Sequence, residues 1–422
     1  MTAEVAVMNK WGVALAADSK VTISHQNGAK GYDGVNKLFA LSKSHPVGIM
    51  VYGNAEFMRI PWEVLIKEFR YKAPVRNFDL LENWSDSFWD FISRLDLIDD
   101  EAQKKNLADV VRAELIEVLA EAKMFASQKT FEFGSDAFVD AMKSHIQHRL
   151  DERLEMDSWL AAEDFNKFSQ RYSETYLAAI SASLGSFQNE ILVEVCLKYT
   201  LISLVSSQLS PRQSGIVFAG YGEKEFFPTL IEYGTDGYIG ESIKRVELAK
   251  VDLSRDNASC IKAFAQSDMV HRFMSGIDVS LFDAISNAFY QVLRGAMCDT
   301  ATRAGQSDKH FLDDLNGRAE TAAKELVDSI SNYIEEHYSS PIVDMVGMLP
   351  KEELAGLAEA LVSLTSLKRR VSSDLETVGG PVDVALISKR DGFIWIKRKH
   401  YFSKDLNHHF FRNYFGSPQD ES

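Results

Sequence analysis

The feature that most constrains the fold is a long helical block without proline, set between two stretches of strand pattern. Proline is absent from residues 76–209, and across 78–207 apolar residues recur at three- and four-residue spacing among many Glu, Lys and Asp. Ala108, Val111 and Leu115 belong to one such face. This periodicity is typical of amphipathic helices that bury one face. We therefore expect several helices in this block.

Strand patterns precede the block. Apolar runs at 5–8 and 13–17 flank a short turn, which predicts a hairpin. Runs at 38–41 and 47–51 predict a second strand pair, and a helical pattern follows at 57–70. The chain is therefore expected to begin in β-structure.

Strand patterns also follow the block. Strands are predicted at 215–220, 229–232 and 260–265, and residues 233–237 are interpreted as a turn. The remaining predicted elements are three helices and a last strand pair, at 279–293, 312–337, 352–370, 382–387 and 393–396. This order of strands, helices, strands, helices and strands predicts an α+β fold. Two antiparallel sheets packed as a sandwich between helical layers would bury the apolar faces.

Charge and composition exclude several classes of function. The formal net charge of −15 disfavours a general nucleic-acid binder and an anionic membrane surface as partners. No stretch reaches the roughly 20 apolar residues of a membrane span, and residues 1–5 lack the pattern of a signal peptide. The three cysteines are widely spaced and are interpreted as reduced thiols. We therefore expect a cytoplasmic protein.

Thr2 is the first candidate catalytic residue. A small residue after the initiator Met favours removal of Met1, which would make Thr2 the N-terminal residue. The α-amine of a terminal Thr, with an unperturbed pKa of about 7.7–8.0, can accept the proton of its own hydroxyl. A Thr at position 2 is common, so this residue alone is weak support for catalysis.

The residues after Thr2 follow an ordered pattern. Asp18 ends the hairpin segment GVALAAD, Lys37 precedes an apolar strand, and Gly53 ends the segment GIMVYG. This pattern resembles the N-terminal part of proteasome β-subunits and of the related bacterial protease that works with an ATP-driven unfoldase. These proteins are N-terminal-nucleophile (Ntn) hydrolases of the threonine type.

The resemblance implies a role for each of these residues. Thr2 matches the nucleophile, and Asp18 matches the buried acid that pairs with the catalytic lysine. Lys37 matches that lysine, whose charge would favour the neutral amine and stabilise a developing alkoxide. Gly53 matches the glycine whose amide supplies the oxyanion hole. Taken singly, Asp18 could close a turn, Lys37 could be a surface lysine, and Gly53 could precede a helix.

The C-terminal half offers weaker matches. Ser267 follows a predicted strand at about the place where the family carries an active-site serine. Asp374 and Thr377 keep an acid–hydroxyl spacing of three ahead of Gly379 and Gly380. These glycines are displaced by one residue from the family pattern, which either a one-residue bulge or a different set of supporting groups around the site would explain.

The resemblance extends over most of the chain outside the helical block. It implies an Ntn-hydrolase core formed by residues 2–70 and 214–398, folded as a four-layer αββα sandwich. Residues 72–210 would be a helical insertion, and 399–422 a C-terminal tail. An insertion of this size is absent from ordinary β-subunits.

The function implied is hydrolysis of peptide bonds through an acyl-enzyme on Thr2, without a metal or an organic cofactor. The expected substrate is a peptide or an unfolded protein. A self-assembling homo-oligomer is expected, and an ATP-driven unfoldase is a candidate partner. Two alternatives stay open. One is a small-molecule amidase or acylase on the same fold, and the other is a catalytically silent assembly subunit, which a retained Met1 would favour.

Overall fold

The computed structural model describes residues 2–25, 28–72, 77–95, 99–129, 131–187, 189–305, 308–372 and 378–415. The chain divides into two compact units. The first comprises Met1–Leu38, Leu253–Ser388 and Ile394–Ser422, and the second comprises Phe39–Asp252 and Lys389–Phe393. Both units combine antiparallel strand pairs with helices, so the predicted α+β class is confirmed. No described helix is both long and apolar enough to cross a membrane.

The first unit is built on a sheet in which the strand order is β12-β1-β2-β13-β14. The predicted N-terminal hairpin is present, with Val7 opposite Ala14, and the last predicted hairpin forms β13 and β14. The central strands β1 and β2 are buried along their whole length. The strand bounds are β1 Ala3–Asn9, β2 Gly12–Ala17, β12 Ser259–Ala265, β13 Asp383–Ser388 and β14 Gly392–Lys397.

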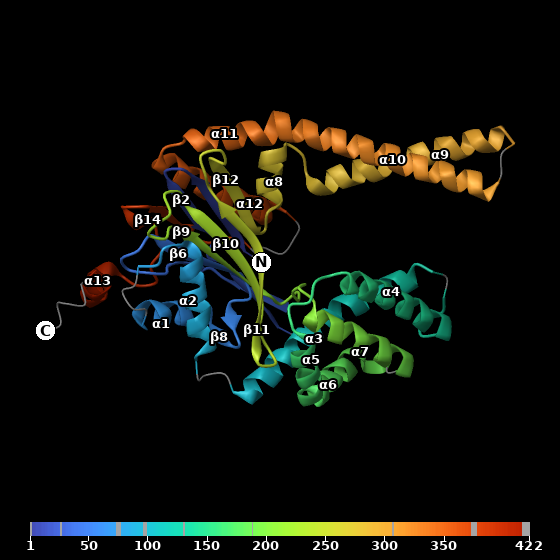
Figure 1. Ribbon diagram of the computed structural model, residues 1–422, viewed down its shortest axis with the longest axis horizontal. Helices are drawn as coiled ribbons and strands as arrows, with labels where there is room; N and C mark the ends of the chain where they lie inside the picture. The colour runs from blue at the N-terminus through green and yellow to red at the C-terminus, as the bar shows by residue number, and fades with distance from the viewer. Residues whose placement is uncertain are drawn as a thin grey trace. The chain divides into compact units, whose positions relative to one another are not determined.

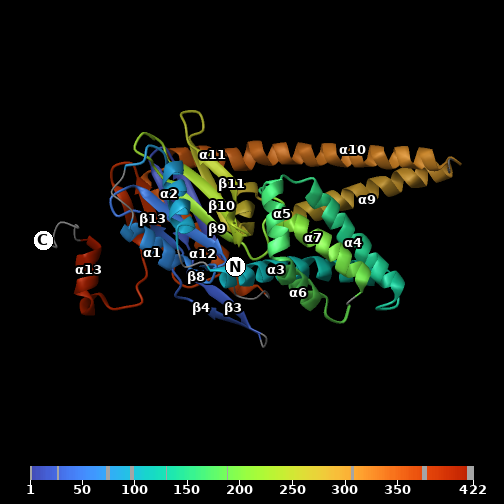
Figure 2. The same ribbon diagram turned by 60° about the horizontal axis from the view of Figure 1, so that its bottom comes forward.

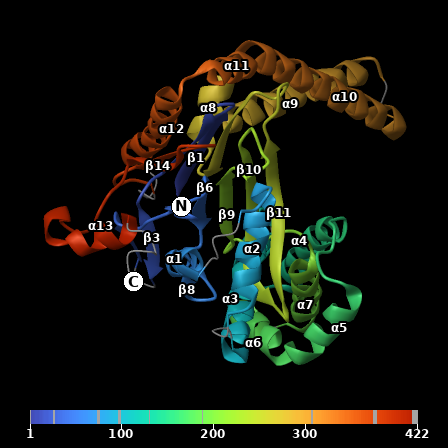
Figure 3. The same cartoon turned by 60° about the vertical axis from the view of Figure 1, so that its left-hand side comes forward.

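Helices α11 (Ser340–Met348) and α12 (Lys351–Val371) cover one face of this sheet (Figure 3). Val5 and Ala16 of the sheet belong to the same apolar core as Leu361 of α12. The predicted helix at 352–370 is therefore confirmed. Acidic residues in its first turn and basic residues in its last turn complement the helix dipole.

The first unit also contains elements that extend from this core. The two helices predicted at 279–293 and 312–337 are confirmed, the first extending ten residues further than predicted, and they form a long hairpin whose two arms lie side by side in Figure 1. The small hairpin β3–β4, visible in Figure 2, and the last helix α13 were not predicted. The bounds are β3 Val21–His25, β4 Gly28–Tyr32, α8 Asp268–Ser275, α9 Val279–Arg303, α10 Lys309–Ile334, η2 Glu335–Ser339, η3 Lys404–Leu406 and α13 His408–Phe415.

The second unit has its own five-stranded sheet, of order β11-β10-β9-β6-β5. The turn predicted at 233–237 is wrong, because β10 continues through it. The register of the β10–β11 pairing shifts at two places, one of them between Thr235 and Gly237. Irregularities of this kind let the strand continue through a turn-like sequence. The strand bounds are β5 Leu38–Ala40, β6 Val47–Gly53, β9 Ser214–Gly220, β10 Thr229–Ile239 and β11 Ser242–Asp252.

Helices α1 (Trp62–Lys72) and α2 (Leu81–Ser93) pack on this sheet through an aromatic core. The helix predicted from residue 57 begins only at Trp62. Two short strands, β7 (Glu56–Phe57) and β8 (Ile60–Pro61), form a tight hairpin first. Met58 and Arg59 at its turn have positive φ values of 52° and 69°, which a helix does not allow.

The predicted helices of the block are confirmed, and α3, α4, α6 and α7 are labelled in Figure 2. Most of the buried apolar residues of the block form one separate core. Val111, Leu115 and Val118 of α3 belong to this core, as the spacing of apolar residues predicts. The bounds are α3 Asp100–Ser127, α4 Asp136–Leu154, α5 Ala162–Arg171, α6 Ser173–Leu184, η1 Gly185–Phe187 and α7 Glu190–Val205.

Candidate active site

Asp18 is the centre of the candidate site in the first unit. It follows β2, and its side chain is completely buried. Its Oδ1 accepts hydrogen bonds from Lys37 Nζ at 2.6 Å and from the amide of Ala3 at 3.1 Å. Its Oδ2 accepts from the amides of Lys20 at 3.2 Å and Gly379 at 3.0 Å. Four donors, one of them 361 residues away in the sequence, therefore fix this carboxylate.

Lys37 lies just before β5, and its side chain is only 6% exposed. Its ion pair with Asp18 is therefore shielded from solvent and from salt screening. The same carboxylate oxygen also binds the amide of the residue that follows Thr2. The sequence-predicted pair of Asp18 and Lys37 thus lies together, next to the start of β1.

Thr2 is buried, and hydrogen bonds on both sides of it fix the backbone. The carbonyl of Thr2 accepts from the amide of Gln266 at 3.0 Å, and the carbonyl of Ala3 accepts from the amide of Asp18 at 3.1 Å. The first contact comes from the end of β12, and the second from the end of β2. The start of β1 is therefore held between two neighbouring strands.

Ser267 is the N-cap residue of α8, one residue after Gln266. It is partly exposed, and its hydroxyl makes no capping hydrogen bond to the helix. Ala265 has a φ of +60°, an unfavourable value for a residue other than glycine. Such strain is often found at functional sites. Here it accompanies the bend that ends β12 and leads to Gln266 and Ser267.

The last turn of α12 holds the loop that contains Ser267. Arg369 Nε donates to the side-chain oxygen of Gln266, and Lys368 pairs with Asp268. Burial pushes the pKa of Asp268 upward, but the hydrogen bond and charge of Lys368 outweigh it, so this pKa lies below its usual range. No local sequence pattern predicts these contacts, because Lys368 and Asp268 are 100 residues apart.

Three predicted site residues remain: Gly53, Asp374 and Thr377. Gly53 ends β6 in the second unit with a φ of +76°, and no helix begins there, since α1 starts at Trp62. A Cβ on Gly53 would lie 2.5 Å from the carbonyl oxygen of Gln213, so the position requires glycine. Asp374 and Thr377 lie outside the described residues.

The sequence did not predict the backbone donors to Asp18. The amide of Gly379 reaches Oδ2, and the hydroxyl of Ser19 donates to the carbonyl of Pro381. The Gly-Gly-Pro sequence at 379–381 was the available signal, because glycines allow close approach of one backbone to another group. These contacts connect the segment before β13 to the end of β2.

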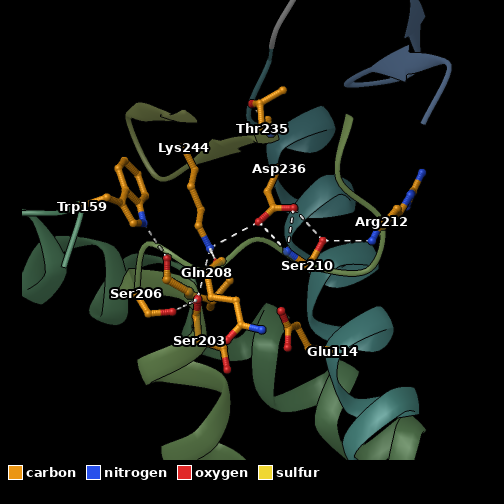
Figure 4. A network of polar contacts seen from close by, with 12 residues as sticks. Glu114, Trp159, Ser203, Ser206, Gln208, Ser210, Arg212, Thr235, Asp236 and Lys244 are labelled. Carbon is orange, nitrogen blue, oxygen red and sulfur yellow. Dashed lines mark hydrogen bonds and ion pairs between the residues drawn. The ribbon is translucent and has the colours of Figure 1, made fainter. Parts of the chain in front are cut away.

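The second unit contains a different buried polar cluster, drawn in Figure 4. Lys244 lies 3.2 Å from Asp236, and its ammonium also donates to the carbonyls of Ser203 and Gln208. The backbone amide and the hydroxyl of Ser210 both donate to Asp236. Burial lowers the pKa of Lys244, and the charge of Asp236 opposes this effect. The cluster fixes β10 and β11 to the segment that follows α7.

A further buried ion pair lies in the helical core of this unit. Arg153 donates to Glu114 at 2.7 Å, and Tyr199 donates to the same carboxylate at 3.3 Å. Burial raises the pKa of Glu114, and it raises the pKa of Tyr199 to about 12. In the part of the chain that the structure describes, no group of three or more His, Cys, Asp or Glu side chains is arranged to hold a metal ion.

Comparisons with known proteins add little to this description. No family model matches the sequence, and no curated protein matches it. Two solved structures of Anbu from Hyphomicrobium sp. strain MC1, one of them a Gly-1 mutant, align with 98% of this chain and with 91% and 92% of their own. The identities are 11% and 10%, and both TM-scores are 0.27. A similarity at this TM-score carries no argument about fold or function.

Proposed function

We propose that this chain is a threonine-type Ntn hydrolase that cleaves peptide bonds through an acyl-enzyme on Thr2, after removal of Met1. The observation that carries the proposal is the buried ion pair of Lys37 and Asp18, because its carboxylate also binds the amide of Ala3. A lysine fixed in this way beside the start of β1 can act on a nucleophile at Thr2. The proposal includes the four-layer sandwich, with a core of 2–70 and 214–398.

The reaction proposed for Thr2 uses only functional groups of this protein and water. Its Oγ attacks the substrate carbonyl carbon while the hydroxyl proton passes to the α-amine. The tetrahedral intermediate collapses, the C–N bond breaks, and the leaving amine takes the proton from the Thr2 ammonium. The α-amine then activates water, which releases the acyl group from Oγ. The positive charge of Lys37 favours the neutral form of the α-amine and stabilises the developing alkoxide.

Supporting roles are proposed for the remaining predicted residues. The hydroxyl of Ser267, which makes no capping bond, is available for a proton relay next to Thr2. The amide of Gly53 is proposed as an oxyanion donor, and Asp374 and Thr377 as groups that support the site. The helical insertion at 72–210 and the tail at 399–422 complete the proposed domain organisation.

The location, substrate and partners proposed for the enzyme follow from the resemblance to proteasome β-subunits. The enzyme would act in the cytoplasm on peptides or unfolded proteins, as a homo-oligomer that could work with an ATP-driven unfoldase. A small-molecule amidase would use the same nucleophile on a different substrate. Comparing the cleavage of an unfolded protein with that of short acyl amides separates these two functions.

The decisive experiment treats the purified protein with a β-lactone or an epoxyketone directed at terminal threonines, followed by intact mass measurement and peptide mapping. Loss of Met1 and an adduct on Thr2 are expected in the wild type. The adduct should be lost in Lys37→Ala and retained in the matched surface variant Lys67→Ala, since Lys67 forms only an exposed pair with Glu63. A retained Met1 without an adduct would contradict the proposal and favour a silent assembly subunit.

A further inference from the structure

The helical hairpin of the first unit has almost no buried surface. Helices α9 and α10 contain 25 and 26 residues and lie side by side (Figure 1). Of the side chains that the structure describes in them, only those of Ala301 and Ala319 are buried. Helices in proteins gain most of their stability from packing of an apolar face. A hairpin this long is therefore expected to pack against another surface.

One face of α9 supplies an apolar surface for such packing. Its large side chains recur at spacings of four, four and three residues, which places them on one side of the helix. The opposite side contacts α10, since Arg294 and Cys298 both reach Asn316. The exposed side, here called the α9 stripe, consists of Leu281, Ile285, Phe289 and Val292, at 53%, 46%, 37% and 71% exposure.

The size of the α9 stripe is sufficient for the centre of an interface. These four side chains expose on the order of 350 Å² of apolar surface, which is in the range of the largest apolar patches on monomers, and such patches are often functional. A standard interface buries roughly 800 Å² per partner, with an apolar centre and a polar rim. The stripe and the polar residues beside it on α9 would account for most of that area.

Two copies of helix α9 in antiparallel orientation would have complementary shapes. The bulky residues of the stripe lie between 281 and 292, whereas the part of α9 after Leu293 is rich in small residues. The small residues Ala296, Thr300 and Ala304 line an apolar hollow together with Phe311 and Leu315 of α10. Antiparallel pairing of two α9 helices would place Leu281 of one copy against Ala296 and Thr300 of the other. Parallel pairing would set bulky residues against bulky ones and leave the hollow open.

The charge of α9 also favours a second copy as the partner. The chain carries a net charge of −15, so most surfaces of two copies repel each other. In α9, Asp283 and Asp299 balance Arg294 and Arg303, and the stripe itself carries no charge. An amphipathic helix that binds anionic lipid has a basic polar face instead. We propose that two copies of this chain pair antiparallel through α9, about a two-fold axis near Phe289.

The first test measures the mass of the full chain by light scattering and sedimentation over a range of concentrations. Phe289→Glu would place two carboxylates close together at the axis, and we expect the dissociation constant of the dimer to rise by about 100-fold. Asn287→Glu is the matched control, because it adds the same charge on an exposed side of α9 away from the stripe. A wild type that is monomeric throughout, or equal effects of the two variants, would overturn the proposal.

The second test determines the direction of pairing by disulfide formation in a Cys298→Ser background. Leu281→Cys and Ala296→Cys variants should form a mixed disulfide when combined and none when either is alone. In the proposed pairing, the two copies of residue 281 are separated by about 25 Å along the helix. A disulfide requires Cα atoms closer than about 7 Å. Disulfides between identical positions would overturn the antiparallel arrangement, whether or not Thr2 is catalytic.

Discussion

Lys37 Nζ lies 2.6 Å from Asp18 Oδ1, and the two side chains are 6% and 0% exposed. Water cannot replace either partner at such a position, so removal of one leaves a buried charge without its counter-ion. Asp18 also accepts three backbone amide hydrogen bonds, which would lose their acceptor together with the ion pair. The fold of the first unit should therefore depend strongly on this one carboxylate.

Replacement of Asp18 by Ala should lower the free energy of unfolding by about 3–5 kcal/mol, as for other buried pairs from which one partner is removed. Urea denaturation measures this change. Glu63→Ala is the control, because it removes one partner of the exposed pair with Lys67, worth less than about 1 kcal/mol. An effect of Asp18→Ala no larger than that of the control would contradict the burial described for the pair.

The buried Glu114 should make stability depend on pH. Burial raises its pKa above the ordinary value of 4.5, and this effect exceeds the opposing effect of Arg153. Between 4.5 and the raised pKa, the folded state keeps a proton that the unfolded state has lost, so stability falls as the pH rises. The unfolding free energy of the wild type minus that of Glu114→Gln should fall with pH above 4.5. A constant difference would show that the pKa of Glu114 is not shifted by folding, and a rising difference would show that folding lowers it; either would contradict the prediction.

The cysteines should differ strongly in reactivity. Cys196 is fully buried, and burial raises its pKa to about 12, so roughly one molecule in 10⁴ would carry the reactive thiolate at pH 8. Cys298 is partly exposed on α9. Alkylation with iodoacetamide, followed by peptide mapping, should modify Cys298 first and Cys196 only in urea. Rapid modification of Cys196 in the native protein would contradict the packing of α7.

Two glycine substitutions should change stability in opposite directions. Gly53→Ala should destabilise by at least about 2 kcal/mol, because a Cβ at a φ of +76° is unfavourable and would lie 2.5 Å from a carbonyl oxygen. Gly356→Ala, in open space on α12, should stabilise by up to about 1 kcal/mol through helix propensity. Thermal unfolding measures both variants. Equal effects would contradict the left-handed conformation of Gly53.

The sequence was most informative where a repeating pattern and the local structure agree. The runs at 5–8 and 13–17 predict the hairpin of β1 and β2, and the spacing around Leu115 predicts α3, because each pattern reflects burial of one face. The predicted turn at 233–237 failed because the side chain of Asp236 is held by Ser210 and Lys244. The contact with Ser210 comes from a segment 26 residues away, which a local pattern does not report.

The candidate site was also predicted only in part from the sequence. The resemblance to proteasome β-subunits predicts Asp18 and Lys37 as a pair, and the structure brings these two side chains together. The contact of Arg369 with Gln266 depends instead on where the end of α12 meets the end of β12. Such a meeting is set by packing of the whole unit, so no short motif could have predicted it.

The hydrogen bond from Gly379 to Asp18 joins residues 361 positions apart, and it has a consequence for synthesis of the chain. At ribosomal rates of about 5–20 residues per second, Asp18 is made roughly 20–70 s before Gly379. The hairpin of β1 and β2 lacks both neighbours until β12 is made, and it lacks β13 throughout the interval. A two-stranded hairpin alone is marginally stable. The nascent N-terminal segment therefore stays accessible to processing enzymes until the last strands arrive.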